Sequence, residues 1–171
     1  MNAQRFKTLV INYHRQLYRT AFFMLGNMED AEDAVQDTYL KLWKVRDSLD
    51  TTTNLEAYCK SALRRVCFDK MRANRLDMSV EIGDIAETHY ASENCERMVE
   101  TRNEMDYLYE ALRQLPQGQR MVIFMRDIED CTMEEICETS GFSESNIRSM
   151  LSRGRKSIKD YIKKVFDYGI A

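Results

Sequence analysis

The sequence is poor in the residues that punctuate strands and tight turns, with one proline and six glycines among 171 residues. Proteins built from many short strands need such residues often, so an all-helical protein is the first expectation. No apolar run approaches the roughly 18 residues that a membrane span requires, and the N-terminus, MNAQRFKTLV, has no signal-peptide pattern. We therefore expect a cytoplasmic protein without direct membrane insertion.

The residues of catalytic and metal sites are also scarce. There are two histidines without a second-ligand spacing, and an odd number of cysteines without a CxxC pair: Cys59, Cys67, Cys95, Cys131 and Cys137. Reduced, buried thiols explain these cysteines better than a metal or redox site. No Ser-His-Asp, Cys-His, P-loop or paired-acid arrangement is visible. We expect no metal, no cofactor and no enzymatic activity.

A net charge of −3 hides a polarised chain. Residues 1–75 carry 13 basic and 9 acidic side chains, residues 76–107 carry 2 and 9, and residues 108–171 carry 10 and 10. Within the last part, residues 127–144 hold seven acidic side chains and no basic one, and residues 146–165 hold seven basic against one acidic. Such local segregation allows contact with nucleic acid despite the acidic total.

The first part of the chain has the pattern of three helices. Apolar residues recur at three- and four-residue spacing over 6–25, and Gly26 is a typical stop. Asn27 suits the N-cap of a second helix, whose first turns are acidic as the helix dipole favours. Thr53 and Glu56 predict a capping box for the third helix.

Residues 76–93 are acidic and lack periodicity, which indicates a linker. We predict two small helical domains, over residues 1–75 and 104–171, joined by a flexible linker over residues 76–103. The fold class is therefore all-α.

Periodicity resumes at Met105, and Pro116 marks a break before the next helix. Thr132 and Glu135 form a second capping-box pattern, for a short helix over 133–139. Ser143 suits the N-cap of a final helix of about twenty residues.

The segment CETSGFSESNIRSMLSRGRK has the spacing of a helix-turn-helix. Counting from Cys137, the glycine Gly141 comes four residues later, Ile147 ten later and Met150 thirteen later. A small residue lets the second helix cross closely, the glycine takes a positive φ in the turn, and the apolar residues hold the second helix against the first.

The outward side of that second helix is polar and basic in its N-terminal half. We call it the recognition face: Ser145, Asn146, Arg148, Ser149, Ser152 and Arg153. Arginine pairs with guanine and asparagine with adenine in the major groove, and Arg155, Lys156 and Lys159 would extend the basic surface toward phosphates. A helical hairpin with a solvated basic helix is the alternative.

A second candidate DNA-binding segment covers residues 57–75, where aromatic side chains such as Tyr58 are interleaved with basic ones. The basic residues are Lys60, Arg64, Arg65, Lys70, Arg72 and Arg75. Aromatic and basic side chains together hold unstacked bases and their phosphates. The polar loop Arg46–Asn54, which precedes this segment, could take one extruded base. A solvated basic helix is at least as compatible with this segment.

The third feature lies in MEDAEDAVQDTYLKLWK. Three carboxylates and a glutamine share one side of the helix, and we call this the acidic face: Asp30, Asp33, Gln36 and Asp37. It would suit a basic helical partner, although a solvated helix surface has the same pattern.

Together these segments resemble the extracytoplasmic-function group of bacterial RNA polymerase sigma factors, small members of the sigma-70 family. DAEDAVQDTYLKLW is similar to the polymerase-binding helix of that group, and YCKSALRRVCFDKMR to its promoter −10 segment. The stretch from LPQGQR to RGRKSI is similar to its −35-binding domain. The resemblance covers residues 5–75 and 104–166.

The resemblance implies a role for each segment. The acidic face would meet the clamp coiled coil of the largest polymerase subunit. The −10 element would be read and opened by the loop around Ser48–Asn54, with Tyr58 and Arg64. The −35 groove would receive Arg148, Ser149 and Arg153. Members of this group are commonly held inactive by an anti-sigma factor, which the resemblance implies as a further partner.

Two positions depart from the family pattern and bear on base preference. Arg65 stands where many members have asparagine, and Met150 stands where many have arginine. Two other functions remain open from the residues alone: a helix-turn-helix regulator that binds DNA independently as a dimer, and a purely protein-binding helical module.

Overall fold

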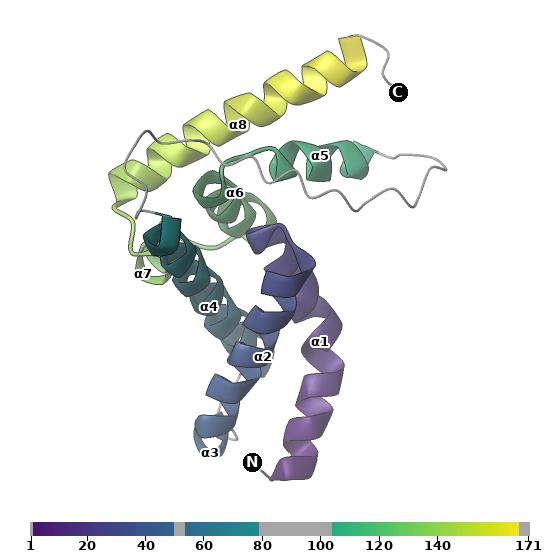
Figure 1. The fold of residues 1–171 in the computed structure, drawn as a ribbon, viewed down its shortest axis with the longest axis vertical. Coiled ribbons are helices and arrows are strands. Elements are labelled where there is room, and N and C mark those ends of the chain that lie inside the picture. Colours follow the sequence, from purple (N-terminus) through teal and green to yellow (C-terminus); the bar gives the residue numbers. More distant parts are fainter. Residues whose placement is uncertain (1, 50–53, 79–103, 168–171) are drawn as a thin grey trace. The chain divides into compact units, whose positions relative to one another are not determined.

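The computed structural model describes residues 2–49, 54–78 and 104–167. Within these residues, every element of secondary structure is a helix (Figure 1). The chain separates into two compact units, Met1–Gly83 and Asp84–Ala171. Unit 1 contains α1 (Ala3–Leu25), α2 (Met28–Lys44), α3 (Arg46–Leu49) and α4 (Leu55–Met78). Unit 2 contains α5 (Glu104–Arg113), α6 (Gln117–Ile123), the π-helix η1 (Phe124–Ile128), α7 (Met133–Ser140) and α8 (Glu144–Asp167).

In unit 1, α1, α2 and α4 pack against one another (Figure 1). The connection between α1 and α2 follows its sequence signals. Gly26 takes the left-handed conformation with φ 86° and donates its N–H to Phe22 O, and the Asn27 side chain accepts from the N–H of Asp30. The core contains large, fully buried side chains from all three helices: Leu17, Met24, Leu42, Leu63, Phe68 and Met71.

Two local predictions in unit 1 need correction. The segment predicted as a loop begins with the helical turn α3, whose Leu49 is buried. The cap of α4 comes from Asn54, which accepts from the N–H of Ala57 at 3.0 Å, while Thr53 lies outside the described residues. Glu56 instead accepts from Gln16 and pairs with Lys60.

The predicted linker begins inside a helix. Helix α4 continues past Arg75 to Met78, so its last turn enters the segment 76–103. The remainder of that segment, 79–103, lies outside the described residues.

Unit 2 is built around α6 and α8. Helix α8 packs on α6 and α5, and α7 packs on α8 and η1. Buried side chains at the centre are Leu112, Met121, Met125, Ile136 and Ile147. The π-helix was not predicted from the sequence. It widens the turn so that the N–H of Glu129 reaches Phe124 O at 3.0 Å.

The cysteines that the structure describes are free thiols. Cys59, Cys67 and Cys131 are buried, Cys137 is half-buried, and Cys95 lies outside the described residues. Burial raises the pKa of Cys59 to about 11, which keeps this thiol protonated and unreactive at neutral pH. Among the described residues, no cluster of three or more His, Cys, Asp or Glu side chains could hold a metal ion, and no helix is long and apolar enough to cross a membrane.

Candidate nucleic-acid and polymerase interfaces

The first helix of the predicted helix-turn-helix is α7, and its start is fixed by a complete capping box. Thr132 Oγ1 accepts from the N–H of Glu135 at 3.2 Å, and Glu135 Oε2 accepts from the N–H of Thr132 at 2.8 Å. Reciprocal bonds of this kind satisfy N–H groups that a helix start leaves open. The sequence pattern predicted this cap correctly.

The turn between α7 and α8 also follows the prediction. Gly141 has φ 73° and donates its N–H to Cys137 O at 2.9 Å, ending α7. A residue with a β-carbon is strained in this conformation, so glycine is the favoured residue here. Ser143 then caps α8, because its Oγ accepts from the N–H of Asn146 at 3.3 Å.

Helix α8 presents the recognition face to solvent. Ile147, Leu151 and Gly154 are buried on the opposite side. All six recognition-face residues and Lys156 are exposed. The structure therefore brings these predicted DNA-binding residues together on one surface near the N-terminus of a 24-residue helix, where the helix dipole favours anions.

Two arginines of α8 are engaged by carboxylates that sequence reasoning did not connect to them. The Arg148 guanidinium donates to Glu144, one turn earlier on the same helix. Arg155 donates to Asp127 of η1, so the predicted contact with phosphates would require it to leave this carboxylate. Arg153 forms no ion pair within the described part of the chain.

The second candidate DNA surface lies on α4 of unit 1. Asn54, Tyr58 and Arg65 are exposed, and Tyr58 keeps 42% of its surface accessible. Their spacing of four and seven residues places them on one side of the helix. A polar, an aromatic and a basic side chain thus share one exposed stripe.

Arg64 lies elsewhere, among the core side chains with only 9% of its surface exposed. It precedes buried Phe68 by four residues and Met71 by seven, so the helical period places it at the edge of the apolar stripe. A contact between Arg64 and DNA would require this side chain to move outward, and its predicted role stays a prediction.

Other cations of α4 are occupied by carboxylates of unit 1. Lys60 pairs with Glu56 at 2.8 Å and Arg72 with Asp69 at 2.6 Å. Arg75 belongs to the last turns of α4, where side chains lie outside the described set. Three of the six cations of this segment, Lys60, Lys70 and Arg72, are thus paired with carboxylates, and Arg65 is the exposed arginine of the stripe.

The acidic face lies on α2, and part of it contacts α4. Asp33, Gln36 and Asp37 are exposed, and Asp30 is half-buried where it accepts from the Asn27 amide at 2.6 Å. Lys70 of α4 lies 3.9 Å from Asp33 and 3.5 Å from Asp37.

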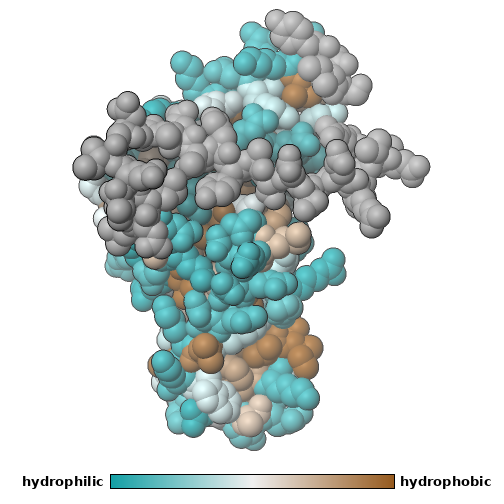
Figure 2. Space-filling model, in the orientation of Figure 1, coloured by the Kyte–Doolittle hydropathy of each residue, from teal (hydrophilic) through white to brown (hydrophobic). Residues whose placement is uncertain are grey.

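Apolar side chains are also exposed on unit 1. Phe6 and Trp43 meet edge to face with ring centroids 4.9 Å apart, and the Arg46 guanidinium lies 4.5 Å from the Trp43 ring centroid. Figure 2 shows brown surface toward the lower end of unit 1, below a mainly hydrophilic middle. Trp43 remains 38% exposed.

Comparison with protein families gives two matches in the order that the segments predict. The model described as sigma-70 region 2 matches residues 9–76, and the model described as sigma-70, region 4 matches residues 105–158. Together they cover more than two thirds of the chain. The first match contains the acidic face and α4, and the second contains the helix-turn-helix.

Curated relatives and a solved structure agree with these matches. The chain is 28% identical to the ECF RNA polymerase sigma factor SigE of Mycolicibacterium smegmatis, over 91% of this chain and 61% of that protein. It is 24% identical to SigX and to SigV of Bacillus subtilis, covering 84% and 90% of their lengths. The sigma factor RpoE of Bartonella quintana, solved in complex with the anti-sigma factor NepR, shares the fold. Its TM-score is 0.62 at 24% identity, over 94% of this chain and 98% of that one.

The two helical units match sigma-70 regions 2 and 4 in the expected order, and the relatives are named as ECF sigma factors. These matches identify the family. The chain belongs to the extracytoplasmic-function group of sigma-70 RNA polymerase sigma factors, which initiate transcription.

Proposed function

We propose that this sigma factor recruits core RNA polymerase through the acidic face of α2 and reads promoters with two separate surfaces. In unit 2, the recognition face of α8 and Lys156 enter the major groove at the −35 element. In unit 1, the stripe of Asn54, Tyr58 and Arg65 acts at the −10 element. The observation that carries the proposal is the recognition face itself, exposed on a capped second helix whose opposite side is buried.

The −10 part of the proposal uses the chemistry of the stripe. An exposed tyrosine ring offers a stacking surface to a base that has left the duplex, and Arg65 lies two turns along the same side of α4. Asn54 stands at the N-terminus of α4, next to backbone N–H groups that favour phosphate. Such a surface stabilises opened DNA rather than intact duplex.

Three further features belong to the proposal. The protein acts in the cytoplasm, catalyses no reaction of its own, and is controlled by an anti-sigma factor. The last of these is supported by the Bartonella quintana sigma factor of the same fold, which was solved with such a partner. The partner would have to cover the acidic face or the recognition face to prevent initiation.

Reconstituted transcription tests the proposed function. Core polymerase with this chain should start RNA synthesis at defined positions on a fragment library, and start-site mapping should reveal shared −35 and −10 sequences. Core polymerase alone provides the control. An independent regulator would instead bind a duplex tightly without polymerase, and initiation at no defined start site would overturn the proposal.

The acidic face gives a separate prediction. Replacing both Asp33 and Asp37 by lysine should weaken association with core polymerase by about tenfold or more, because like charges would oppose a basic partner surface. The fold should survive, since both side chains are more than half exposed, although the variant also loses their contacts with Lys70. Binding is measured by co-purification and by titration of fluorescently labelled core polymerase.

A matched variant controls for the change in total charge. Lysine at both Glu134 and Glu138, two exposed positions on α7, changes the net charge by the same amount and should leave association unchanged. Normal association of the Asp33 and Asp37 variant would remove the polymerase-binding role from the acidic face.

A further inference from the structure

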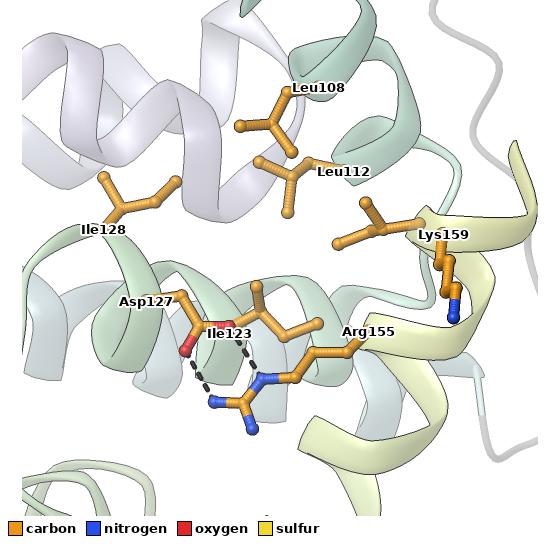
Figure 3. Close-up of a pocket in the computed structure, with 8 residues that line it drawn as sticks. Leu108, Leu112, Ile123, Asp127, Ile128, Arg155 and Lys159 are labelled. Atoms are coloured by element: carbon orange, nitrogen blue, oxygen red, sulfur yellow. Dashed lines mark hydrogen bonds and ion pairs between the residues drawn. The ribbon is translucent and has the colours of Figure 1, made fainter. Parts of the chain in front are cut away.

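Arg155 forms an ion pair through two hydrogen bonds with Asp127 in unit 2. Its Nε donates to Asp127 Oδ2 at 2.9 Å and its Nη2 donates to Asp127 Oδ1 at 2.6 Å (Figure 3). This two-bond arrangement uses the planar fork of the guanidinium, which a lysine cannot reproduce. The pair joins the middle of α8 to η1 through two residues that lie 28 positions apart in the chain.

The pair stands at the edge of a pocket between α5, the α6–η1 segment and α8. The pocket has a volume of about 260 Å³ and an apolar lining that includes Leu108, Leu112 and Ile128, together with Ile123 and Ile158 (Figure 3). Side chains do not fill this space, so the apolar packing of α8 is incomplete at the pocket, although the neighbouring Gly154 lies close to Ile123. The ion pair adds a directional contact between α8 and η1 beside the pocket.

The position of Arg155 on α8 makes this contact relevant to DNA. Arg153, Arg155 and Lys156 are all exposed, but the Arg155 guanidinium is bonded to Asp127 of η1. A small rotation of α8 about its axis would move all recognition-face side chains relative to the base edges at once. Misplacement of about 1 Å is enough to break hydrogen bonds of ordinary length.

We propose that Arg155 and Asp127 are positioning residues for −35 recognition, which lock the rotation of α8 against η1 and do not themselves touch the DNA. The inference rests on the proposed −35 role of the recognition face. The competing interpretation is that Arg155 leaves Asp127 and binds a phosphate when DNA arrives.

The two interpretations predict opposite results for Asp127→Ala. If the pair positions α8, Arg155 loses its acceptor in this variant, so −35 recognition weakens. A phosphate-binding Arg155 would instead be released, and a negative charge near the DNA would disappear, so binding would strengthen. Arg155→Lys also distinguishes the two interpretations. A lysine can still bind a phosphate as a point charge, but it cannot form the two-bond contact of the planar guanidinium with Asp127.

The experiment uses holoenzyme reconstituted from core polymerase and full-length chain. Transcription is compared on two templates that differ only in the −35 element, one intact as mapped for the unmodified chain and one scrambled. For Asp127→Ala, Arg155→Ala and Arg155→Lys, we expect the advantage of the intact template to fall about two- to fivefold, in line with a solvent-accessible ion pair. The double variant Asp127→Ala with Arg155→Ala should lose no more than either alone.

Three controls keep the outcomes distinct. Asp160→Ala removes an exposed acid from α8 and should leave the template preference unchanged. Core association and activity on the scrambled template should not change, whereas general damage to the fold would lower both. If Asp127→Ala or Arg155→Lys preserves or increases the preference, the lock is wrong. If the unmodified chain does not distinguish the templates, the proposed −35 role fails, and the lock fails with it.

Discussion

Replacing Arg153 by alanine should reduce discrimination at one base pair of the −35 element by about 1–3 kcal/mol, the amount that one bidentate arginine–guanine pair supplies. Arg153 suits this role because it is exposed on α8 and has no ion pair among the described residues. Its guanidinium is therefore available to a base without breaking an ion pair of the described residues. The measurement is competition by holoenzyme between promoters that carry each of the four base pairs at each −35 position.

The way in which the loss of discrimination is distributed over the −35 positions identifies the group that Arg153 contacts. A base-specific contact relaxes preference at one position, whereas a uniform loss across all sequences would mean that Arg153 binds a phosphate. Lys164→Ala, an exposed cation in the last turn of α8, is the matched control and should preserve the base preference. Arg148 is less suitable for this test, because its substitution also releases Glu144.

Local signals in the sequence were sufficient for the helix-turn-helix. The capping box at Thr132, the left-handed glycine Gly141 and the cap at Ser143 each depend on contacts within four residues. Helix caps and glycine turns have the same geometry in many folds, so their residues predict them directly. The exposed recognition face then follows from the helical period once Ile147 and Leu151 are assigned to the core.

Features that depend on packing between distant segments could not be predicted in this way. The contacts of Lys70 with Asp33 and Asp37 join α4 to α2, and the pair of Arg155 with Asp127 joins α8 to η1. A count of charges along the chain does not indicate which acidic and basic side chains pair with one another. The π-helix likewise has no local composition signal, since its residues continue the apolar pattern of α6.

Arg64 is an intermediate case, because its position could have been predicted but was not. The basic segment was judged by the number of its cations, not by the side of the helix on which each one falls. The buried residues Leu63, Cys67 and Phe68 define a core stripe on α4, and Arg64 lies beside it. Helical period separates Arg64 from Arg65, two neighbours in sequence with opposite exposure.

The close packing of α8 on α6 at Gly154 gives the second large effect. Gly154 is buried in α8, and a β-carbon at this position would overlap Cδ1 of Ile123. Gly154→Ala should therefore lower the free energy of unfolding of unit 2 by about 1–3 kcal/mol, the usual cost of overpacking a core. Alanine is the better helix former by about 1 kcal/mol, so a net loss means that the overlap dominates.

Trp43 makes the measurement specific for one unit. It is the only tryptophan and lies in unit 1, so its fluorescence follows unit 1 during denaturation, while circular dichroism follows the helices of both units. Gly154→Ala should move the circular dichroism transition of unit 2 to lower denaturant and leave the Trp43 transition unchanged.

Ile123→Val provides the compensating change, because it removes the Cδ1 that the new β-carbon would meet. Alone it should cost about 0.5–1.5 kcal/mol by deleting a buried methyl group. Combined with Gly154→Ala it should recover part of the stability that alanine loses, a coupling that independent sites would not show. If Gly154→Ala alone is as stable as the parent, the Ile123 side chain can move away from the new β-carbon at little cost in free energy. The recognition helix would then depend less on its close approach to α6, and more on its apolar stripe and the Arg155–Asp127 pair.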